Sequence, residues 1–163
     1  MSMKKTLLVA AVLFASLLPA AAFADGGPVI GLDAQAALPV GNFSDGAGVG
    51  FGGLLRYEFT VTSSFNVTLR AGFMYHLEKA SSTFYSIPLL GGVRVRLGQW
   101  AFVAAEAGAF FNHPGHFDTG LGFTFAIGYR VSNAIDLRLG AEMVDASHAG
   151  DSIALIAGIG YNF

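Results

Sequence analysis

Histidines are the residues of this sequence whose chemistry first suggests a site. The chain has four of them, His76, His113, His116 and His148. Imidazole nitrogens bind transition metals, especially beside carboxylates. The nearest carboxylates in the sequence are Glu78, Asp118, Asp145 and Asp151. No spacing among these residues matches a metal motif, so we expect solvated polar side chains, and the sequence predicts neither a metal site nor a cofactor.

Serine-based hydrolysis would need a hydroxyl within hydrogen-bond reach of an imidazole. Ser152 lies four positions beyond His148, a spacing that an extended strand does not align into such a pair. The sequence therefore predicts no catalytic residue and no enzymatic activity.

The first residues have the pattern of an export signal. Lys4 and Lys5 supply a positive start, and an apolar run covers residues 7–18. Ala22-Phe23-Ala24 then fits the small-residue rule for signal peptidase. The run is short for a membrane helix, and no basic stop-transfer cluster follows it. We predict a signal peptide over residues 1–24 and a single exported domain over residues 25–163.

The predicted exported domain is apolar but has no helix that could span a membrane. It keeps 7 basic and 11 acidic side chains, a net charge of −4, which argues against binding nucleic acid. The chain has no cysteine, so no disulfide framework supports it. Charged residues make up 12% of the chain, against roughly 25% in soluble domains. No apolar run of about 18 residues follows the signal, which leaves a closed β-barrel as the way to cross a bilayer.

Apolar and polar residues alternate with period two through nearly the whole domain, which is typical of β-strands. The sequence predicts eight strands, at residues 29–38, 49–60, 65–77, 84–97, 101–112, 121–131, 135–145 and 152–163. Short turns at 62–64, 98–100 and 132–134 alternate with longer connections at 39–48, 78–83, 113–120 and 146–151. This alternation is the arrangement of outer-membrane barrels, whose short turns face the periplasm.

The two faces of the predicted strands differ sharply in charge. The charged face carries Asp33, Arg56, Glu58, Arg70, Arg94, Arg96, Glu106, Arg130, Asp136, Arg138 and Glu142. Eleven glycines share this face, whereas the other face holds most of the phenylalanines and all five tyrosines. Buried charges must be paired, because desolvation is costly, so we expect these residues to form a luminal charge network in a packed polar core.

The orientation of these faces separates a soluble, lipocalin-like barrel from a membrane barrel. The interior of an eight-stranded barrel is just wide enough for side chains or one small ligand, so glycines belong inside and aromatic rings outside. A soluble exterior would also carry lysines, but the only lysine after residue 24, Lys79, lies in a predicted loop. The sequence predicts the apolar face in lipid, with tyrosines near the strand ends as interfacial girdles.

Three segments carry a resemblance to a known family. They are Leu38-Pro39-Val40-Gly41, Ile87-Pro88-Leu89-Leu90-Gly91-Gly92-Val93 and Ile159-Gly160-Tyr161-Asn162-Phe163. Over residues 28–163 the chain resembles the outer-membrane β-barrel domain family of small eight-stranded OmpA/OmpX-type barrels. The resemblance implies an all-β, antiparallel, up-and-down transmembrane barrel in the cell outer membrane. It also implies that Tyr161 and Phe163 belong to the signal read by the outer-membrane barrel assembly machinery.

A shared fold does not determine function, so the resemblance leaves several activities open. Lipid A deacylases on similar barrels use a His-x-Ser pair, and none of the four histidines here begins that pattern. We expect a non-catalytic, monomeric outer-membrane barrel with a structural or surface-interaction role, in contact with outer-membrane lipids and lipopolysaccharide. The alternatives are a small porin-like channel for ions or small solutes and, less favoured, a lipid A-modifying enzyme.

Overall fold

The computed structural model describes residues 27–41, 47–78, 84–113, 118–146 and 150–163. The predicted signal peptide and Lys79 lie outside these ranges. The strands are β1 (Val29–Val40), β2 (Ala47–Thr60), β3 (Phe65–Glu78), β4 (Phe84–Leu97), β5 (Ala101–His113), β6 (Asp118–Arg130), β7 (Ile135–Ala146) and β8 (Gly150–Asn162). The eight-stranded, all-β prediction is confirmed.

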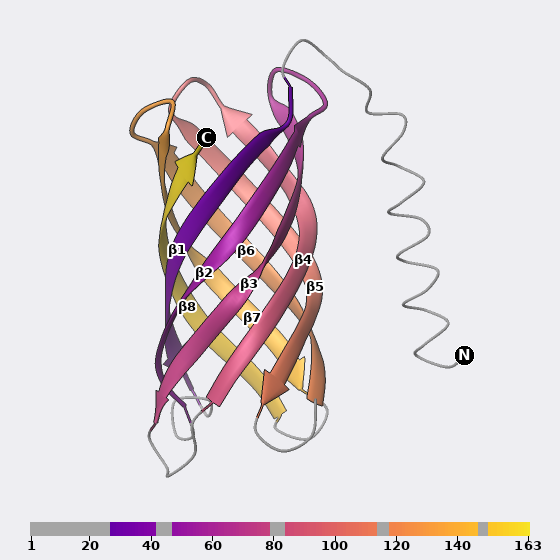
Figure 1. Ribbon diagram of the computed structural model, residues 1–163, viewed down its shortest axis with the longest axis vertical. Coiled ribbons are helices and arrows are strands. Elements are labelled where there is room, and N and C mark those ends of the chain that lie inside the picture. Colours follow the sequence, from indigo (N-terminus) through magenta and orange to yellow (C-terminus); the bar gives the residue numbers. More distant parts are fainter. Residues whose placement is uncertain (1–26, 42–46, 79–83, 114–117, 147–149) are drawn as a thin grey trace, which may run out of the picture.

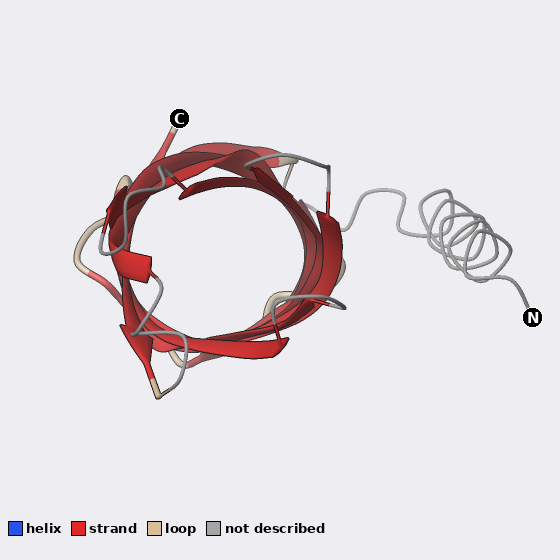
Figure 2. Ribbon diagram, turned by 90° about the horizontal axis from the view of Figure 1, so that it is seen from below, coloured by secondary structure: helices blue, strands red, loops and turns tan. Residues whose placement is uncertain are grey.

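Each strand pairs antiparallel with the next, and β1 pairs with β8 to close the barrel (Figures 1 and 2). At the closing seam Leu32 lies opposite Tyr161 and Ala36 lies opposite Ala157. Closure leaves no strand with an unpaired edge, which satisfies the backbone polar groups without water. None of the described residues forms a helix long and apolar enough to span a membrane.

Strand ends agree with the predicted ends to within two residues, with one exception. β6 begins at Asp118, three residues before its predicted start. Asn112 of β5 pairs with Asp118 in the observed register, so the β5–β6 ladder continues into a segment whose glycine suggested a loop. Pairing between strands therefore outweighed the local preference for a turn. Most residues of the predicted longer connections lie outside the described residues.

Two of the short turns have the same hydrogen-bonding scheme. Thr62 Oγ1 accepts hydrogen bonds from the backbone N–H groups of Ser64 and Phe65, at 3.3 and 3.0 Å. Ser132 Oγ accepts from the equivalent N–H groups two and three residues later, at 3.2 and 3.1 Å. The third turn uses Gly98, whose φ of +75° favours glycine. All three turns lie at the end of the barrel where the C-terminus lies (Figure 1).

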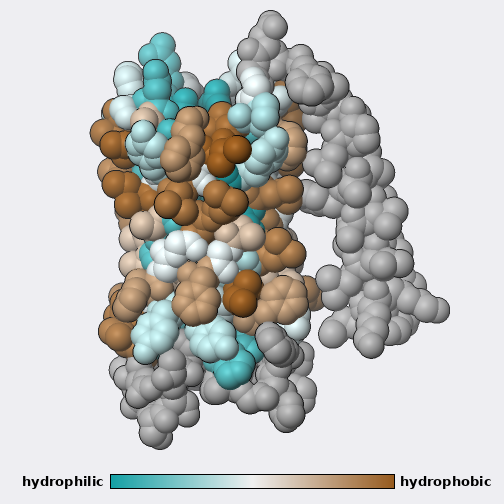
Figure 3. All heavy atoms as spheres, in the orientation of Figure 1, coloured by the Kyte–Doolittle hydropathy of each residue, from teal (hydrophilic) through white to brown (hydrophobic). Residues whose placement is uncertain are grey.

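The outer face of the barrel is apolar, which confirms the predicted orientation. Phe123, Leu139 and Leu55 have exposed fractions of 62%, 61% and 57%. Hydrophobic residues cover much of the barrel wall in the view of Figure 3, and hydrophilic ones gather at its upper rim. Tyr129 and Tyr161, both near the short-turn end, are also about half exposed on this face, at 53% and 51%. An exposed apolar belt of this extent requires lipid around it.

Candidate functional site

The barrel interior holds a large group of buried charged side chains. Eight charged side chains are buried there: Asp33, Arg56, Glu58, Arg70, Arg94, Glu106, Asp136 and Arg138. The three other residues expected on this face, Arg96, Arg130 and Glu142, are partly exposed. With the exception of Glu142, these residues lie toward the strand ends that meet at the short turns. We call this region the charged half of the lumen.

Arg56 joins three carboxylates from three strands. Its Nε lies 3.2 Å from Asp33 Oδ1, its Nη1 lies 2.8 Å from Glu58 Oε2, and its Nη2 lies 3.4 Å from Asp136 Oδ2. The Nη2 group also donates to Asn162 Oδ1 at 2.8 Å. The guanidinium has 1% of its side chain exposed, so these partners replace the water that it loses on burial.

A second cluster centres on Glu106. Its Oε2 lies 2.9 Å from Arg70 Nη1 and 2.7 Å from Arg138 Nη2. Arg70 reaches on to Asp33 Oδ2 at 2.9 Å and donates to Gln35 Oε1 at 3.0 Å. Because Asp33 contacts both Arg56 and Arg70, the two clusters form one continuous network across the lumen.

Arg94 ties the network to the barrel end with the short turns. Its Nη1 lies 3.0 Å from Asp136 Oδ2 and 3.2 Å from Glu58 Oε2. The guanidinium carbon also stands 3.9 Å from the centre of the Phe102 ring, within range of a cation–π interaction. Asn66 donates a short hydrogen bond to the other oxygen of Glu58. These contacts leave little open space between the side chains of this half.

Three charged luminal residues have either a longer ion pair or none among the described residues. Arg96 Nη2 lies 3.8 Å from Glu58 Oε1, and Arg130 Nε lies 3.7 Å from Asp136 Oδ1, with about a quarter of each arginine side chain exposed at 26% and 24%. Glu142 makes no ion pair within 4.0 Å in the described part of the chain. It lies on β7 between the charged residues and a set of apolar residues toward the other end of the lumen.

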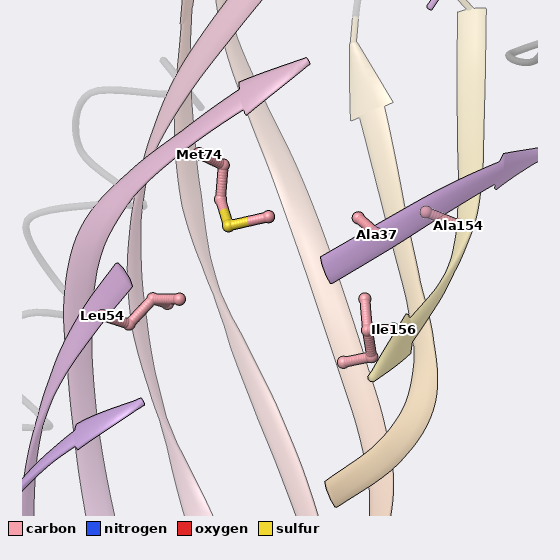
Figure 4. Close-up of a cluster of buried hydrophobic side chains, with 5 residues drawn as sticks. All are labelled: Ala37, Leu54, Met74, Ala154 and Ile156. Atoms are coloured by element: carbon pink, nitrogen blue, oxygen red, sulfur yellow. The ribbon is translucent and has the colours of Figure 1, made fainter. Parts of the chain in front are cut away.

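Buried apolar side chains fill the part of the lumen farther from the short turns. One cluster comprises Ala37, Leu54, Met74, Ala154 and Ile156, drawn in Figure 4 on the inner side of the strands. A second cluster comprises Leu90, Phe110 and Val144. We call the two clusters together the apolar half of the lumen.

The apolar half corrects the expectation of a polar core throughout. Its residues occupy the same alternating positions as the arginines, so the sequence contained the signal. Met74 and Ile156 fall on the charged face of their predicted strands, but charges and glycines decided the assignment of that face. The interior thus carries its buried charges toward the short turns, whereas the part farther away holds two apolar clusters together with the uncharged Ser86 and the imidazole of His76.

Luminal glycines bring neighbouring groups close together rather than leaving a wide pore. A Cβ added at Gly92 or Gly108 would clash with the backbone of the adjacent strand, and one at Gly128 would clash with the Phe102 ring. The charged half does contain a cavity of about 10 Å³, lined by Asp33, Arg70 and Asp136 among others. This volume holds about one water molecule.

Two of the four histidines contradict the expectation of solvated loop residues. His76 lies in β3 with 5% of its surface exposed, and its ring packs against Gly50. His113 lies in β5 and stacks on Tyr85, with ring centres 4.7 Å apart. His116 and His148 lie outside the described residues. Within the described ranges no three residues of metal-binding type come together.

The predicted assembly signal lies at the outer surface of the short-turn end. Tyr161 and Phe163 are 51% and 76% exposed, and their rings meet edge to face with centres 5.2 Å apart. The Phe163 N–H donates to Ile30 O at 2.9 Å, which fixes the end of β8 against β1.

Comparison with solved structures finds barrels of the same architecture. The N-terminal β-barrel domain of Pseudomonas aeruginosa OprF gives a TM-score of 0.63 at 12% identity, covering 83% of this chain and 97% of that chain. Neisserial surface protein A gives 0.58 at 16% identity, covering 85% and 98%. Ail of Yersinia pestis in a phospholipid nanodisc gives 0.59 at 11% identity, covering 84% and 100%. No family model and no curated protein matches the chain.

At these identities the likeness establishes the fold. The chain has the fold of the small eight-stranded outer-membrane β-barrels. Its exposed apolar belt supplies an independent physical argument for a lipid environment. Fold and belt together place the protein in an outer membrane as an integral β-barrel.

Proposed function

We propose that this protein is a non-catalytic integral outer-membrane barrel with a structural or surface-interaction role. The filled lumen is the observation that carries the proposal. Arg56, Arg70 and Glu106 link strands across the interior in the charged half, and buried apolar side chains fill space in the apolar half. A barrel filled in this way stiffens the wall and offers its surfaces, rather than a path, for function.

The luminal charge network is proposed to serve as the core of the barrel. Its members come from strands far apart in the sequence, such as Arg56 on β2 and Asp136 on β7. Paired charges of this kind hold distant strands in one arrangement, because an unpaired partner would remain buried and uncompensated. This role requires neither a metal nor a cofactor.

The surroundings of the barrel follow from the proposal. Its belt would contact outer-membrane lipids and lipopolysaccharide, and residues 1–24 would direct export as a cleaved signal peptide. Tyr161 and Phe163 would be read by the barrel assembly machinery during insertion, and the mature barrel would function as a monomer. Mass spectrometry of the protein purified from outer membranes tests the cleavage, with a first residue of Asp25 expected.

Conductance across a planar bilayer tests the filled lumen. We expect the refolded chain of residues 25–163 to be silent while its circular dichroism shows a folded barrel. Stable unitary current steps would instead favour the porin-like alternative and give the luminal arginines a role in ion selectivity.

Lipid A analysis tests the absence of catalysis. We expect mass spectra of lipid A from cells that overproduce the protein to match those from cells with an empty vector. An acyl chain lost or gained in the presence of the protein would contradict the proposal and favour a lipid A-modifying enzyme.

A further inference from the structure

Two luminal arginines lie at the end of the barrel beside the short turns. Arg96 is the next-to-last residue of β4, and Arg130 is the last residue of β6. Their backbone N–H groups donate to Ser64 O and Trp100 O in the adjoining turns, at 2.7 and 2.6 Å. Their side chains are 26% and 24% exposed, so solutes can reach them from this end. We call this end of the lumen the short-turn mouth.

The carboxylates nearest to these two arginines already have a closer partner. Arg96 Nη2 lies 3.8 Å from Glu58 Oε1. Arg130 Nε lies 3.7 Å from Asp136 Oδ1. Arg94 Nη1 is closer to both carboxylates, at 3.2 and 3.0 Å. The two exposed arginines therefore contact one pair of buried carboxylates that Arg94 already joins, and neither arginine has a short ion pair of its own among the described residues.

Positive charge is in excess at the short-turn mouth within the described ranges. The eight buried charged side chains are four arginines and four carboxylates, which offset one another. Arg96 and Arg130 come in addition to these eight, and the three short turns contain no acidic residue. Glu142 lies six residues beyond Asp136 on β7, toward the apolar half. That separation is about 20 Å of extended chain, well beyond the distance of an ion pair.

The ligand that suits such a mouth is an oxyanion. A guanidinium group donates hydrogen bonds in a planar fork that matches the oxygens of phosphate. Apolar walls around a charged opening also focus its electric field and attract ions of the opposite sign. We propose that the short-turn mouth binds an oxyanion of the phosphate class, with Arg96 and Arg130 as donors. This binding is independent of the structural role of the barrel, so each can fail without the other.

A phosphate titration of the unaltered barrel tests the site. The mature protein is labelled with ¹⁵N-arginine and refolded in maltoside micelles, which contain no phosphate. Sodium phosphate then replaces sodium chloride at constant ionic strength. We expect saturable shifts of the Nε–Hε signals of Arg96 and Arg130, while the signal of the buried Arg138 stays in place. Signals that do not move, or equal shifts at all three arginines, would overturn the proposal.

Single variants test which residues bind the anion. Arg96→Gln and Arg130→Gln should each weaken phosphate binding by about tenfold, because each removes charge-assisted hydrogen bonds. Glu142→Gln is the matched control, since it also changes the luminal charge by one unit but lies far from the mouth, and it should leave the affinity unchanged. Circular dichroism checks that each variant folds. Unchanged affinity in both folded arginine variants, or an equal effect of Glu142→Gln, would overturn the site.

Free phosphate and a phospholipid headgroup are two sources of the same ligand chemistry, and phosphatidylglycerol bicelles distinguish them. Arg96 and Arg130 signals that are already shifted in these bicelles, and no longer respond to added phosphate, would support the site with a headgroup as its ligand. Signals that still respond would support the site with the free anion as its ligand. Signals that match those in maltoside micelles and ignore added phosphate would contradict the proposal.

Discussion

The two halves of the lumen solve the same packing problem with different chemistry. In the charged half, Arg56, Arg70 and Arg138 fill the space and pair with buried carboxylates through contacts of 2.7–3.4 Å. In the apolar half, Leu54, Phe110 and the other members of the two clusters fill it with apolar side chains. The charged half depends on each partner being present, because a charge left alone stays buried. The apolar half depends on volume, because a missing side chain leaves a void.

The largest expected effect tests the charged half. Glu106→Gln removes the charge that pairs with Arg70 and Arg138, and Glu106 is the only ion-pair partner of Arg138 among the described residues. We expect a loss of about 3–5 kcal/mol in the free energy of unfolding, because a buried guanidinium is left uncompensated. Urea titration of the barrel in lipid vesicles, followed by tryptophan fluorescence, measures the loss.

Glu142→Gln is the matched control for that prediction. Both residues are luminal glutamates, but Glu142 has no ion pair within 4.0 Å in the described ranges. We expect a much smaller change in unfolding free energy than for Glu106→Gln. Equal losses for the two variants would contradict the idea that specific pairing stabilises the charged half.

Consecutive leucines test the apolar half. Leu54 is 1% exposed inside the barrel, and Leu55 is 57% exposed on the lipid face. Leu54→Ala should cost about 2–5 kcal/mol of unfolding free energy by creating a cavity, whereas lipid chains fill the space left by Leu55→Ala. The same urea titration measures both, and a Leu55→Ala loss as large as that of Leu54→Ala would mean that the inner packing is loose.

A charge on the outer wall tests which side of the strands faces lipid. Leu139 is 61% exposed in the middle of β7, and Leu139→Arg should cost about 2–4 kcal/mol in lipid vesicles. Leu97→Arg is the control at the short-turn end of β4, where an arginine near the interface should cost about 0–1 kcal/mol. A neutral Leu139→Arg would show that this face does not lie in hydrocarbon.

The smallest effect on stability is expected at the C-terminus. Phe163 is 76% exposed, and its ring meets the Tyr161 ring edge to face. Phe163→Ala should leave the urea midpoint of the refolded barrel nearly unchanged but lower the amount assembled in cells, measured by heat-modifiability on gels. Normal assembly of Phe163→Ala would remove the basis for an assembly signal at this residue.

Strand number and facing could be predicted from the sequence, because period-two alternation and the position of arginines report them directly. The up-and-down strand order was implied by the family resemblance. The ion pairs could not be predicted, because Arg56 contacts Asp136, which is 80 residues away in the sequence. That contact depends on the stagger between the strands of the closed barrel. The apolar half was missed for a different reason. Leu54 and Met74 share a face with arginines. Because that face was assigned as polar from its charged residues, the apolar residues on it were overlooked.

His76 illustrates a further limit of sequence reasoning. Its position near a predicted strand end suggested solvent, yet the inward phase of β3 directs it into the lumen beside Gly50. At such positions burial depends on whether the alternation along the strand points the side chain inward or outward, and not on the distance from the loop.

Thiol labelling tests the filled lumen most directly, because the chain contains no cysteine of its own. Single-cysteine variants Thr124→Cys, inside the barrel at 2% exposure, and Ser63→Cys, in an exposed short turn, are treated in vesicles with a charged methanethiosulfonate that reaches both ends. The account predicts rapid and complete modification at position 63 and no modification at position 124 in the folded barrel. Modification of both cysteines at similar rates would show a lumen open to water and contradict the account.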